Sequence, residues 1–424
     1  MIQKKVWIFN HYAGNMFEAE GGRHYWFARE LARRGYDVAV FCANSRYERQ
    51  GTFFDFSGSH TVTHTSDGIP FVFVRSVPYD SNGIDRVRDM VAFYRNVQKA
   101  ARSVALECGK PDIIFASSVH PLTLMAGEKL ARSWKIPCVC EVRDLWPEAF
   151  FYAGAVRRDS LLGRALMMGE HNIYRRADAL VFLKPGDHEY IIENGWDTEH
   201  GGDIDMSRCF YINNGIDFHA FQMQRTSEAF EDPDLDCEKN LFIYTGTIRP
   251  TNNVDALVEA ASLLRDREDI EILVYGSGSE LERLKNRVYD MGLSNIVFKG
   301  FVEKRKIPFI LSRAKGTILN YTSNGYNWNR GNSSNKLFEY MAAGKPVIQT
   351  VKMAFSPVDE LHCGISLDEG TPEGIAAAIE RICALNQAEY DDLCRRAKEG
   401  AKSYDFSALT DKLEQVFEVV LRED

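Results

Sequence analysis

The stretch "GNSSNKLFEYMAAGKPVI", residues 331–348, joins small polar residues to a short helical segment and then to a strand. The helix-forming run 336–343 follows Gly, Asn and Ser, and Gly344 with a nearby proline separates it from a β-branched run. Lys336 and Glu339 are three residues apart and therefore share one face of the predicted helix. We expect this face to hold a ligand that is partly anionic and partly rich in hydroxyl groups.

Length and composition bound the class of protein. A chain of 424 residues is too long for one ordinary core, so we expect two domains. Hydrophobic residues at 45% and charged residues at 26% are typical of a globular protein. The first apolar run, within "MIQKKVWIFN", is too short for a signal peptide, and no run approaches the roughly 18 apolar residues of a membrane span. The nine cysteines show neither zinc spacing nor a disulfide framework, which predicts the reducing cytoplasm.

The net charge of −9 is unevenly distributed. Residues 1–210 carry 26 Lys and Arg against 26 Asp and Glu, whereas residues 211–424 carry 25 against 34. A nucleic-acid binder should show a basic stripe across a domain, and none is evident, so we exclude nucleic acid as a partner.

Short apolar, β-branched runs alternate with segments of helical period along the whole chain. This alternation predicts an α/β protein of two doubly wound, Rossmann-like domains with parallel sheets, which face one another across a cleft. We place the joint near "CFYINNGID", so that one domain spans 1–208 and the other 209–404, and we expect the amphipathic helix within 405–424 to cross back to the first domain. The strand-like runs are "KVWIF", "YDVAVFC", "PFVFV", "DIIFAS", "PCVCEV" and "ALVFL", then "LFIYTG", "IEILVYG", "NIVFKG", "GTILNY" and "PVIQTV".

Ligands of doubly wound sheets bind beyond the carboxyl ends of the strands, so the residues after each strand are candidates. Gly21 and Gly22 open a helix after the first strand, either to admit a ligand to free amides or as a plain tight turn. His120 follows "DIIFASS" and is either a cleft residue or a structural histidine. Arg143 and Asp144 follow "CEV" and either line an acceptor site or orient one another in a buried network.

The second half repeats this arrangement with glycines. Gly246 and Thr247 follow "LFIYT", and Gly276 and Gly278 follow "IEILVY". One short glycine pattern is weak evidence, but several at the carboxyl edge of one sheet together predict a nucleotide site built largely from backbone.

The chain resembles retaining glycosyltransferases of family four, which have the GT-B fold. The resemblance covers nearly the whole chain and rests on several motifs in this order: "GGRHYWFARELARRGYDVAVF", "YRRADALVFL", "YINNGID", "YGSGSELERL", "IVFKGFVEKRKIP" and "NKLFEYMAAGKPVI". The motifs "EVRDLWPE" and "SSNKLFEYMAAGKPV" are similar to those of O-antigen and capsule enzymes that transfer N-acetylated amino sugars.

The resemblance implies roles for the quoted stretch. Glu339 would accept hydrogen bonds from the ribose hydroxyls of a UDP-linked sugar, and Lys336 would face its diphosphate. The amides of Ser333, Ser334 and Asn335 would add donors at the helix start, and the base would rest near Phe301 and Val302.

Two departures from the family pattern concern the donor. Gly331 stands where the family usually has a Glu that contacts the donor sugar. Thr247 and Asn252 stand where an Arg and a Lys commonly neutralise the diphosphate, which leaves Arg249 as the nearest substitute and Lys304 or Lys306 as further candidates.

The resemblance also implies a mechanism. Lys336 and Arg249 would stabilise the leaving diphosphate, and His120 would contact the donor sugar or position the acceptor. We expect no metal and no cofactor besides the nucleotide-sugar substrate. A glycan or polyprenyl-diphosphate-linked acceptor would bind the first domain near Gly21, Gly22, Arg143 and Asp144.

The basic amphipathic segments 85–106 and 156–176 either cover the sheet or lie on an anionic membrane, so the expected location is the cytoplasm or the inner face of the cytoplasmic membrane. Two other functions stay open: a GT-B epimerase of UDP-amino sugars, for which Glu141, Asp144 and Glu148 offer carboxylates, and a non-catalytic partner that binds nucleotide-sugars, which Gly331 suggests.

Overall fold

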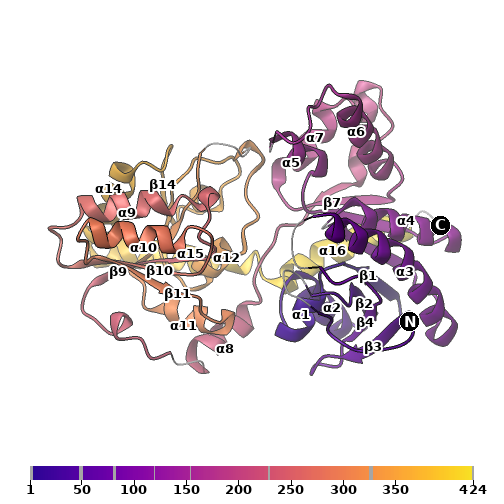
Figure 1. Cartoon of the computed structure of the whole chain (residues 1–424), viewed down its shortest axis with the longest axis horizontal. Helices are drawn as coiled ribbons and strands as arrows, with labels where there is room; N and C mark the ends of the chain where they lie inside the picture. The colour runs from indigo at the N-terminus through magenta and orange to yellow at the C-terminus, as the bar shows by residue number, and fades with distance from the viewer. Residues whose placement is uncertain are drawn as a thin grey trace. The chain divides into compact units, whose positions relative to one another are not determined.

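The protein divides into two compact units, which Figure 1 shows in a computed structural model of the whole chain. The first unit comprises Met1–Asn213 together with Leu409–Asp424, and the second comprises Asn214–Ala408. The chain therefore passes from one unit to the other twice. The structure describes residues 3–46, 51–79, 83–118, 120–152, 154–227, 230–323 and 328–422.

The first unit contains an eight-stranded sheet in the order β3-β4-β2-β1-β5-β6-β7-β8. All neighbouring strands pair in parallel except β3 and β4, which pair antiparallel. The strand order reverses between β1 and β5, which makes the carboxyl ends of these two strands the switch point of the sheet. The strands are β1 (Lys5–Phe9), β2 (Asp37–Ala43), β3 (His60–His64), β4 (Pro70–Val74), β5 (Ile113–Ser118), β6 (Cys138–Val142), β7 (Ala179–Phe182) and β8 (Cys209–Tyr211).

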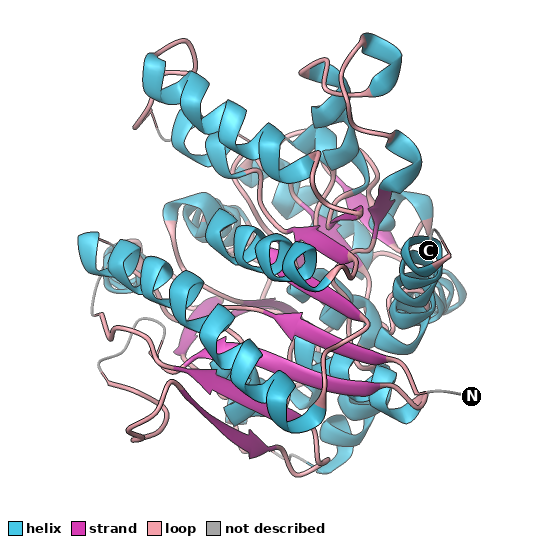
Figure 2. Cartoon of the chain, turned by 90° about the vertical axis from the view of Figure 1, so that its right-hand side faces the viewer, coloured by secondary structure: helices cyan, strands magenta, loops and turns pink. Residues whose placement is uncertain are grey.

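Helices cover both faces of this sheet (Figure 2). On one face, Phe115 of β5 contacts Phe27 of α2 and Phe417 of α16. On the other face, helices α3 and α4 bury Phe93 and Leu124 in one apolar cluster. This double cover explains why the parallel strands are nearly all apolar. The helices are α1 (Gly14–Ala19), α2 (Arg23–Arg33), α3 (Ile84–Cys108), α4 (Pro121–Trp134), α5 (Trp146–Tyr152), α6 (Leu161–Tyr174) and α7 (Glu189–Glu193), with α16 (Phe406–Leu421) from Leu409 onward.

Strand β3, like the short strand Gly364–Ser366 of the second unit, was not predicted from the sequence pattern. The sequence of β3, "HTVTH", has one apolar residue, Val62, and that side chain is exposed, so the strand lacks the apolar run that marks a covered strand. A tight turn returns it to β4: the Thr65 amide donates to Ile69 O, the Ile69 amide donates to Thr65 Oγ1, and Gly68 adopts φ 80°. An antiparallel edge strand needs only such a turn and one paired side.

The second unit contains a six-stranded, wholly parallel sheet in the order β11-β10-β9-β12-β13-β14. Counted along the unit this is the order 3-2-1-4-5-6 of dinucleotide-binding sheets, with the switch point between β9 and β12. The fold prediction of two doubly wound α/β domains is therefore confirmed. The strands are β9 (Asn240–Thr245), β10 (Ile270–Tyr275), β11 (Ile296–Gly300), β12 (Gly316–Leu319), β13 (Val347–Gln349) and β14 (Gly364–Ser366).

Two apolar clusters sandwich the second sheet. One contains residues of α8, α11, α12 and α15, and the other contains residues of α9, α10 and α14. Among the described helices none combines the length and apolar content needed to cross a bilayer. The helices are α8 (Phe218–Ser227), α9 (Val254–Leu263), α10 (Leu281–Asp290), α11 (Ile307–Ser312), α12 (Asn335–Ala342), α13 (Pro357–Glu360), α14 (Pro372–Cys383) and α15 (Gln387–Lys402).

Candidate active site

A cavity of about 630 Å³ lies in the second unit, beyond the carboxyl ends of β9, β10 and β11. Its position is the switch point at which parallel α/β sheets bind ligands. The strands and their loops contribute residues such as Thr245, Gly246, Tyr275 and Gly276, and the start of α12 forms another wall. The volume is within the range of roughly 300–1,000 Å³ that is usual for small-molecule sites.

The start of α12 faces this cavity with Ser334, Asn335 and Lys336. Within the described chain the side chain of the N-cap residue Ser334 accepts no hydrogen bond from the first turn. Its own amide instead donates to Asn332 Oδ1 at 2.9 Å, and Ser333 O accepts from Asn214 Nδ2 at 2.7 Å, which anchors the approach to the helix. The helix therefore presents its first amides and the positive end of its dipole to the cavity.

Lys336 is a cation held mainly by aromatic rings. Its Nζ lies 4.7 Å from the ring centres of both Tyr244 and Tyr321 and 3.3 Å from the Tyr244 hydroxyl. No carboxylate of the described residues forms an ion pair with it. Burial lowers the pKa of Lys336 from 10.5 to about 7, and the negative charge of Glu339 only partly opposes this effect. The site thus holds an ammonium group that lacks a full counter-charge.

Glu339 stands one turn after Lys336 on the same wall of the cavity. Its Oε1 lies 3.2 Å from the Nζ of Lys304, whose side chain is 73% exposed while that of Glu339 is 15% exposed. The ion pair is thus open to water on the lysine side, and its strength is modest. Because Glu339 lines the cavity, its carboxylate can accept hydrogen bonds from a bound hydroxyl pair.

Tyr340 fixes α12 against the end of β9. Its buried hydroxyl accepts a hydrogen bond from the Thr245 amide at 2.9 Å and lies 3.3 Å from the Thr245 carbonyl oxygen. Because Tyr340 follows Lys336 by four residues and so shares its face of the helix, this bond holds Lys336 at the strand end.

Two glycine loops approach one another closely beneath the cavity. A Cβ on Gly276 would lie 1.8 Å from Gly246 O, and a Cβ on Gly278 would lie 2.1 Å from Ile248 O. The amides of Gly246 and Gly276 are already used, because they donate to Tyr275 O and Gly300 O. These glycines therefore serve close backbone packing, and the amides of Gly246 and Gly276 are not available to a ligand.

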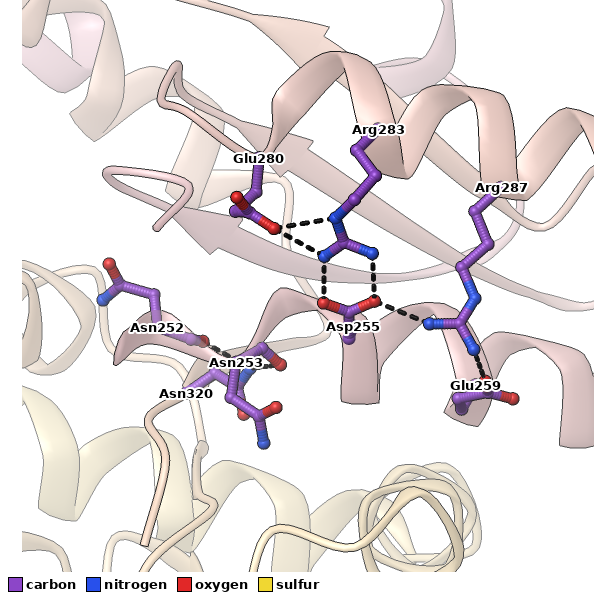
Figure 3. A network of polar contacts seen from close by, with 8 residues as sticks. All are labelled: Asn252, Asn253, Asp255, Glu259, Glu280, Arg283, Arg287 and Asn320. Atoms are coloured by element: carbon purple, nitrogen blue, oxygen red, sulfur yellow. Dashed lines mark hydrogen bonds and ion pairs between the residues drawn. The ribbon is translucent and has the colours of Figure 1, made fainter. Parts of the chain in front are cut away.

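The loop after β9 is anchored at its far end (Figure 3). Asn320 Nδ2 donates to the carbonyl oxygens of Asn252 and Asn253 at 2.8 and 2.7 Å. Beside it, Arg283 and Arg287 of α10 both bind Asp255 of α9, as Figure 3 shows, which fastens the two helices together. Asn252, which lines the cavity, is therefore held on a rigid frame.

In the first unit, His120 lies fully buried at the N-cap of α4, directly after β5. Gly22 is the N-cap of α2 with φ 99°, a conformation that favours glycine. Arg143 is partly buried and its amide donates to Ser118 Oγ at 3.0 Å, whereas Asp144 is exposed. His11 was not selected from the sequence. Its Nδ1 lies 2.8 Å from His120 Nε2.

Each half of the chain matches a known protein family. The family "Glycosyl transferases group 1" matches residues 226–404, and the family "Glycosyl transferase 4-like domain" matches residues 22–200. Both halves are glycosyltransferase domains. In the group 1 domain the matched segment includes the cavity and α12.

Individual relatives of these glycosyltransferase domains are distant. The chain is 20% identical over 278 residues to the probable glycosyltransferase WbjE of Pseudomonas aeruginosa, a match that spans 65% of this chain and 67% of that protein. It is 25% identical over 259 residues to a D-inositol 3-phosphate glycosyltransferase of Mycolicibacterium vanbaalenii, which spans 60% of this chain and 51% of that protein.

Solved structures confirm the GT-B fold. Sucrose-phosphate synthase of Thermosynechococcus elongatus superposes with a TM-score of 0.70 at 16% identity, covering all of both chains. Alr3699/HepE of Anabaena, solved in complex with UDP and glucose, superposes with a TM-score of 0.66 at 14% identity, covering 98% of this chain and 100% of that chain. At these identities the likeness concerns the fold alone.

Most of the residues predicted to bind the donor lie together in the group 1 domain. Their roles toward a donor stay predictions, because the structure shows only that they share one cavity. The predicted residues that line it are Gly246, Thr247, Gly276, Phe301, Val302, Ser334, Asn335, Lys336 and Glu339.

Three of the residues predicted to bind the donor do not line this cavity, and neither does the further candidate Lys306. Arg249 is exposed beside it, Gly278 packs against Ile248, and Ser333 is held by Asn214. Sequence reasoning also missed several lining residues, although two of them stand at strand ends: Tyr275 is the last residue of β10, and Tyr321 is the second residue after β12. The missed residues are Thr245, Tyr275, Ser277, Ile307 and Tyr321.

Proposed function

We propose that this glycosyltransferase chain is a metal-independent, retaining enzyme that moves a sugar from a UDP-linked donor to a lipid-linked or glycan acceptor in bacterial surface polysaccharide synthesis. The observation that carries the proposal is the start of α12, where helix amides, Lys336 and Glu339 meet at one cavity. A nucleoside diphosphate needs these two chemistries, cationic donors for phosphate and an acceptor for the ribose diol.

In the proposed reaction, the bond between the donor's anomeric carbon and the diphosphate oxygen breaks, and a bond from that carbon to the acceptor oxygen forms on the same face. The acceptor's proton leaves with the diphosphate, so no separate general base is required. Negative charge grows on the phosphate oxygens, and pre-positioned donors stabilise that charge most in the transition state. Lys336 and the first amides of α12 are those donors in this proposal.

The uridine base is supported by the Anabaena HepE complexes with UDP, UDP-glucose, and UDP with glucose, which share the fold. We propose an N-acetylated amino sugar as the transferred group on the strength of the motif resemblance. Gly331 adopts φ 88°, which disfavours any side chain there, so contacts to the sugar must come from other residues.

A membrane-borne acceptor is supported by the surface of α6. Leu161, Leu162 and Met168 are 87%, 57% and 65% exposed, and Arg164 lies on the same helix. Exposed apolar residues beside a cation suit the interface of an anionic bilayer. Flotation with phosphatidylglycerol vesicles tests this part: Leu161→Glu with Leu162→Glu should abolish binding if it is correct.

The central test is incubation of the protein with a panel of nucleotide-sugars, with and without candidate acceptors. Release of nucleoside diphosphate that depends on an acceptor, with the anomeric configuration kept in the product, supports the proposal. Isomerisation of the sugar without an acceptor would identify an epimerase, and binding without turnover would identify a non-catalytic partner. Unchanged activity after chelation of metal ions by EDTA is the expected outcome for a metal-independent enzyme.

A further inference from the structure

A buried chain of titratable groups ends at the switch point of the first sheet. His11 follows β1 and His120 follows β5, and these neighbouring parallel strands are the pair between which the strand order reverses. Ligands of such sheets bind at this place. The two histidines and Asp89 of α3 are buried to the same extent, each with no more than 1% of its surface exposed.

The contacts form a line from carboxylate to imidazole to imidazole. Asp89 Oδ2 lies 2.7 Å from His11 Nε2, and His11 Nδ1 lies 2.8 Å from His120 Nε2. Asp89 also accepts from the Ser45 hydroxyl at 2.9 Å and from the Val77 amide at 2.9 Å. The last atom of the line, His120 Nδ1, is buried and has no hydrogen-bond partner in the described chain.

Proton placement along this line follows from the carboxylate. Because Asp89 only accepts hydrogen bonds, His11 Nε2 carries a proton, and neutral His11 then offers a lone pair at Nδ1. His120 Nε2 must donate to that lone pair, so neutral His120 carries its proton at Nε2 and leaves Nδ1 unprotonated. The Thr123 hydroxyl, 3.5 Å from His120 Nε2, is too distant to compete with His11.

His120 is neutral at physiological pH for two reasons. Burial and the positive charge of Arg86 hold the pKa of His120 well below its usual 6.5. Tyr12, whose hydroxyl accepts a hydrogen bond from Arg86 Nε at 3.1 Å, lies beside both histidines.

We propose that Asp89 and His11 are positioning residues that hold His120 in the Nε2–H tautomer, so that its Nδ1 serves as a hydrogen-bond acceptor for a sugar hydroxyl. The hydroxyl as ligand rests on the proposed glycosyltransferase function, whereas the tautomer does not. A buried acceptor without a partner is costly unless a ligand uses it.

A second carboxylate–histidine line in the same unit provides an internal control. Glu141 Oε2 lies 2.9 Å from His24 Nε2, and His24 Nδ1 lies 2.7 Å from Asn10 Nδ2. The side-chain amide of Asn10 donates to His24 Nδ1, so the lone pair of that nitrogen is already used by a group of the protein. His24 therefore reports the same tautomer without any role toward a ligand.

Nitrogen-15 NMR of the full chain with labelled histidine measures the tautomer directly, and a His120→Gln sample assigns the signal. The expected result is a protonated Nε2 and an unprotonated Nδ1 for His120. A protonated Nδ1, or a doubly protonated His11, would overturn the proposal, and this measurement does not depend on any activity.

Asp89→Asn is the decisive variant. Its amide oxygen can keep the Val77 bond while its NH₂ group donates to His11 Nε2, which inverts both histidines and places a proton on His120 Nδ1. Ser45→Ala is the matched control, because it removes a bond to the same Asp89 oxygen without reversing a donor. An unchanged His120 signal in folded Asp89→Asn would overturn the proposal, and if that variant does not fold, the wild-type signal decides.

A second readout tests the ligand. Asp89→Asn should lower turnover at least about tenfold, whereas Ser45→Ala should stay within about twofold of wild type. His120→Asn places an amide oxygen near the Nδ1 position and should retain more activity than His120→Gln, which reaches only the Nε2 position. An equal loss of activity in His120→Asn and His120→Gln would overturn the role of His120 Nδ1 as an acceptor. The tautomer measured by NMR would not be affected by that result. If no variant, wild type included, transfers sugar, the proposed function fails and the tautomer assignment is still decided by NMR.

Discussion

Two cations in this protein occupy opposite electrostatic situations. Arg23, 5% exposed in the first unit, donates from Nε to Glu141 at 2.7 Å and from its other nitrogens to Asn213 O at 2.5 Å and Ile212 O at 2.9 Å. Lys336, in the cavity of the second unit, has two aromatic rings and one hydroxyl around its ammonium group. The first cation is fully compensated within the protein, and the second is not.

The pKa values report the same difference. Burial alone would raise the pKa of Glu141, but the positive charges of Arg23 and Arg143 and the hydrogen bond from His24 outweigh burial and hold that pKa below its usual range. At Lys336 burial prevails and the pKa falls to about 7. A buried charge that is paired within the protein is structural. A buried charge without a counter-ion in the protein is a candidate for binding a charged ligand.

The largest effect should come from breaking the compensated pair. Arg23→Met leaves Glu141 buried without its main counter-charge and should lower the free energy of unfolding by about 3–5 kcal/mol. Arg33→Met on the same helix is the control, because Arg33 is 69% exposed in its pair with Glu30, and it should change stability by less than about 0.5 kcal/mol. Urea denaturation measures the free energy of unfolding of both variants. Equal losses of stability would contradict the assignment of Arg23 as a structural cation.

The uncompensated cation should show the opposite pattern. Lys336→Met should lower turnover about a hundredfold while the free energy of unfolding stays equal or rises, because a poorly solvated charge is removed. Lys345→Met is the control, since burial also lowers the pKa of Lys345 but that residue does not line the cavity. Release of nucleoside diphosphate under saturating donor is the measurement. Full turnover in Lys336→Met would remove Lys336 from the mechanism.

The carboxylate beside this cation should matter for binding. Glu339→Gln should weaken UDP binding about tenfold, as the loss of hydrogen bonds to a charged group predicts. Calorimetry with UDP and with 2′-deoxy-UDP sharpens the assignment. The wild type should bind 2′-deoxy-UDP more weakly than UDP, and Glu339→Gln should bind 2′-deoxy-UDP as weakly as the wild type does. Lys304→Met, which removes only the ion-pair partner of Glu339, should keep the preference for the ribose hydroxyl.

The smallest effect should be a proton taken up on binding. Because the pKa of Lys336 is about 7 in the empty site and rises beside a diphosphate, the ammonium group regains its proton above pH 7. UDP affinity should therefore fall as pH rises above 7, with uptake of about one proton near pH 8.5. Calorimetry in buffers of different ionisation heat measures this uptake, and Lys336→Met should abolish it.

Much of the fold was predictable because its signals are local. Each apolar run that was expected to form a strand does form one, since a strand covered on both faces must be apolar throughout. Strand β3 escaped prediction because it is a half-exposed edge strand and needs no such run. The placement of Lys336 and Glu339 was likewise local, because three residues of helix suffice to put both on one face.

The rest of the candidate site depended on contacts between distant residues. Arg249 follows the right strand, yet it is exposed beside the cavity, whereas Tyr321 reaches Lys336 from the end of another strand. The glycines Gly276 and Gly278 had the expected positions, but close backbone packing accounts for them. Neither result is visible in residue order alone.

Sequence alone determined the alternation of strands and helices, the two-sheet architecture, and the helix that bears a cation and a carboxylate, because these follow from periodicities of a few residues. Tertiary structure decided which charges find partners. Asp89 meets His11 across 78 residues and Arg23 meets Glu141 across 118, and only the folded sheets bring these pairs together. Whether a charged group stabilises the fold or stands ready for a ligand depends on that pairing.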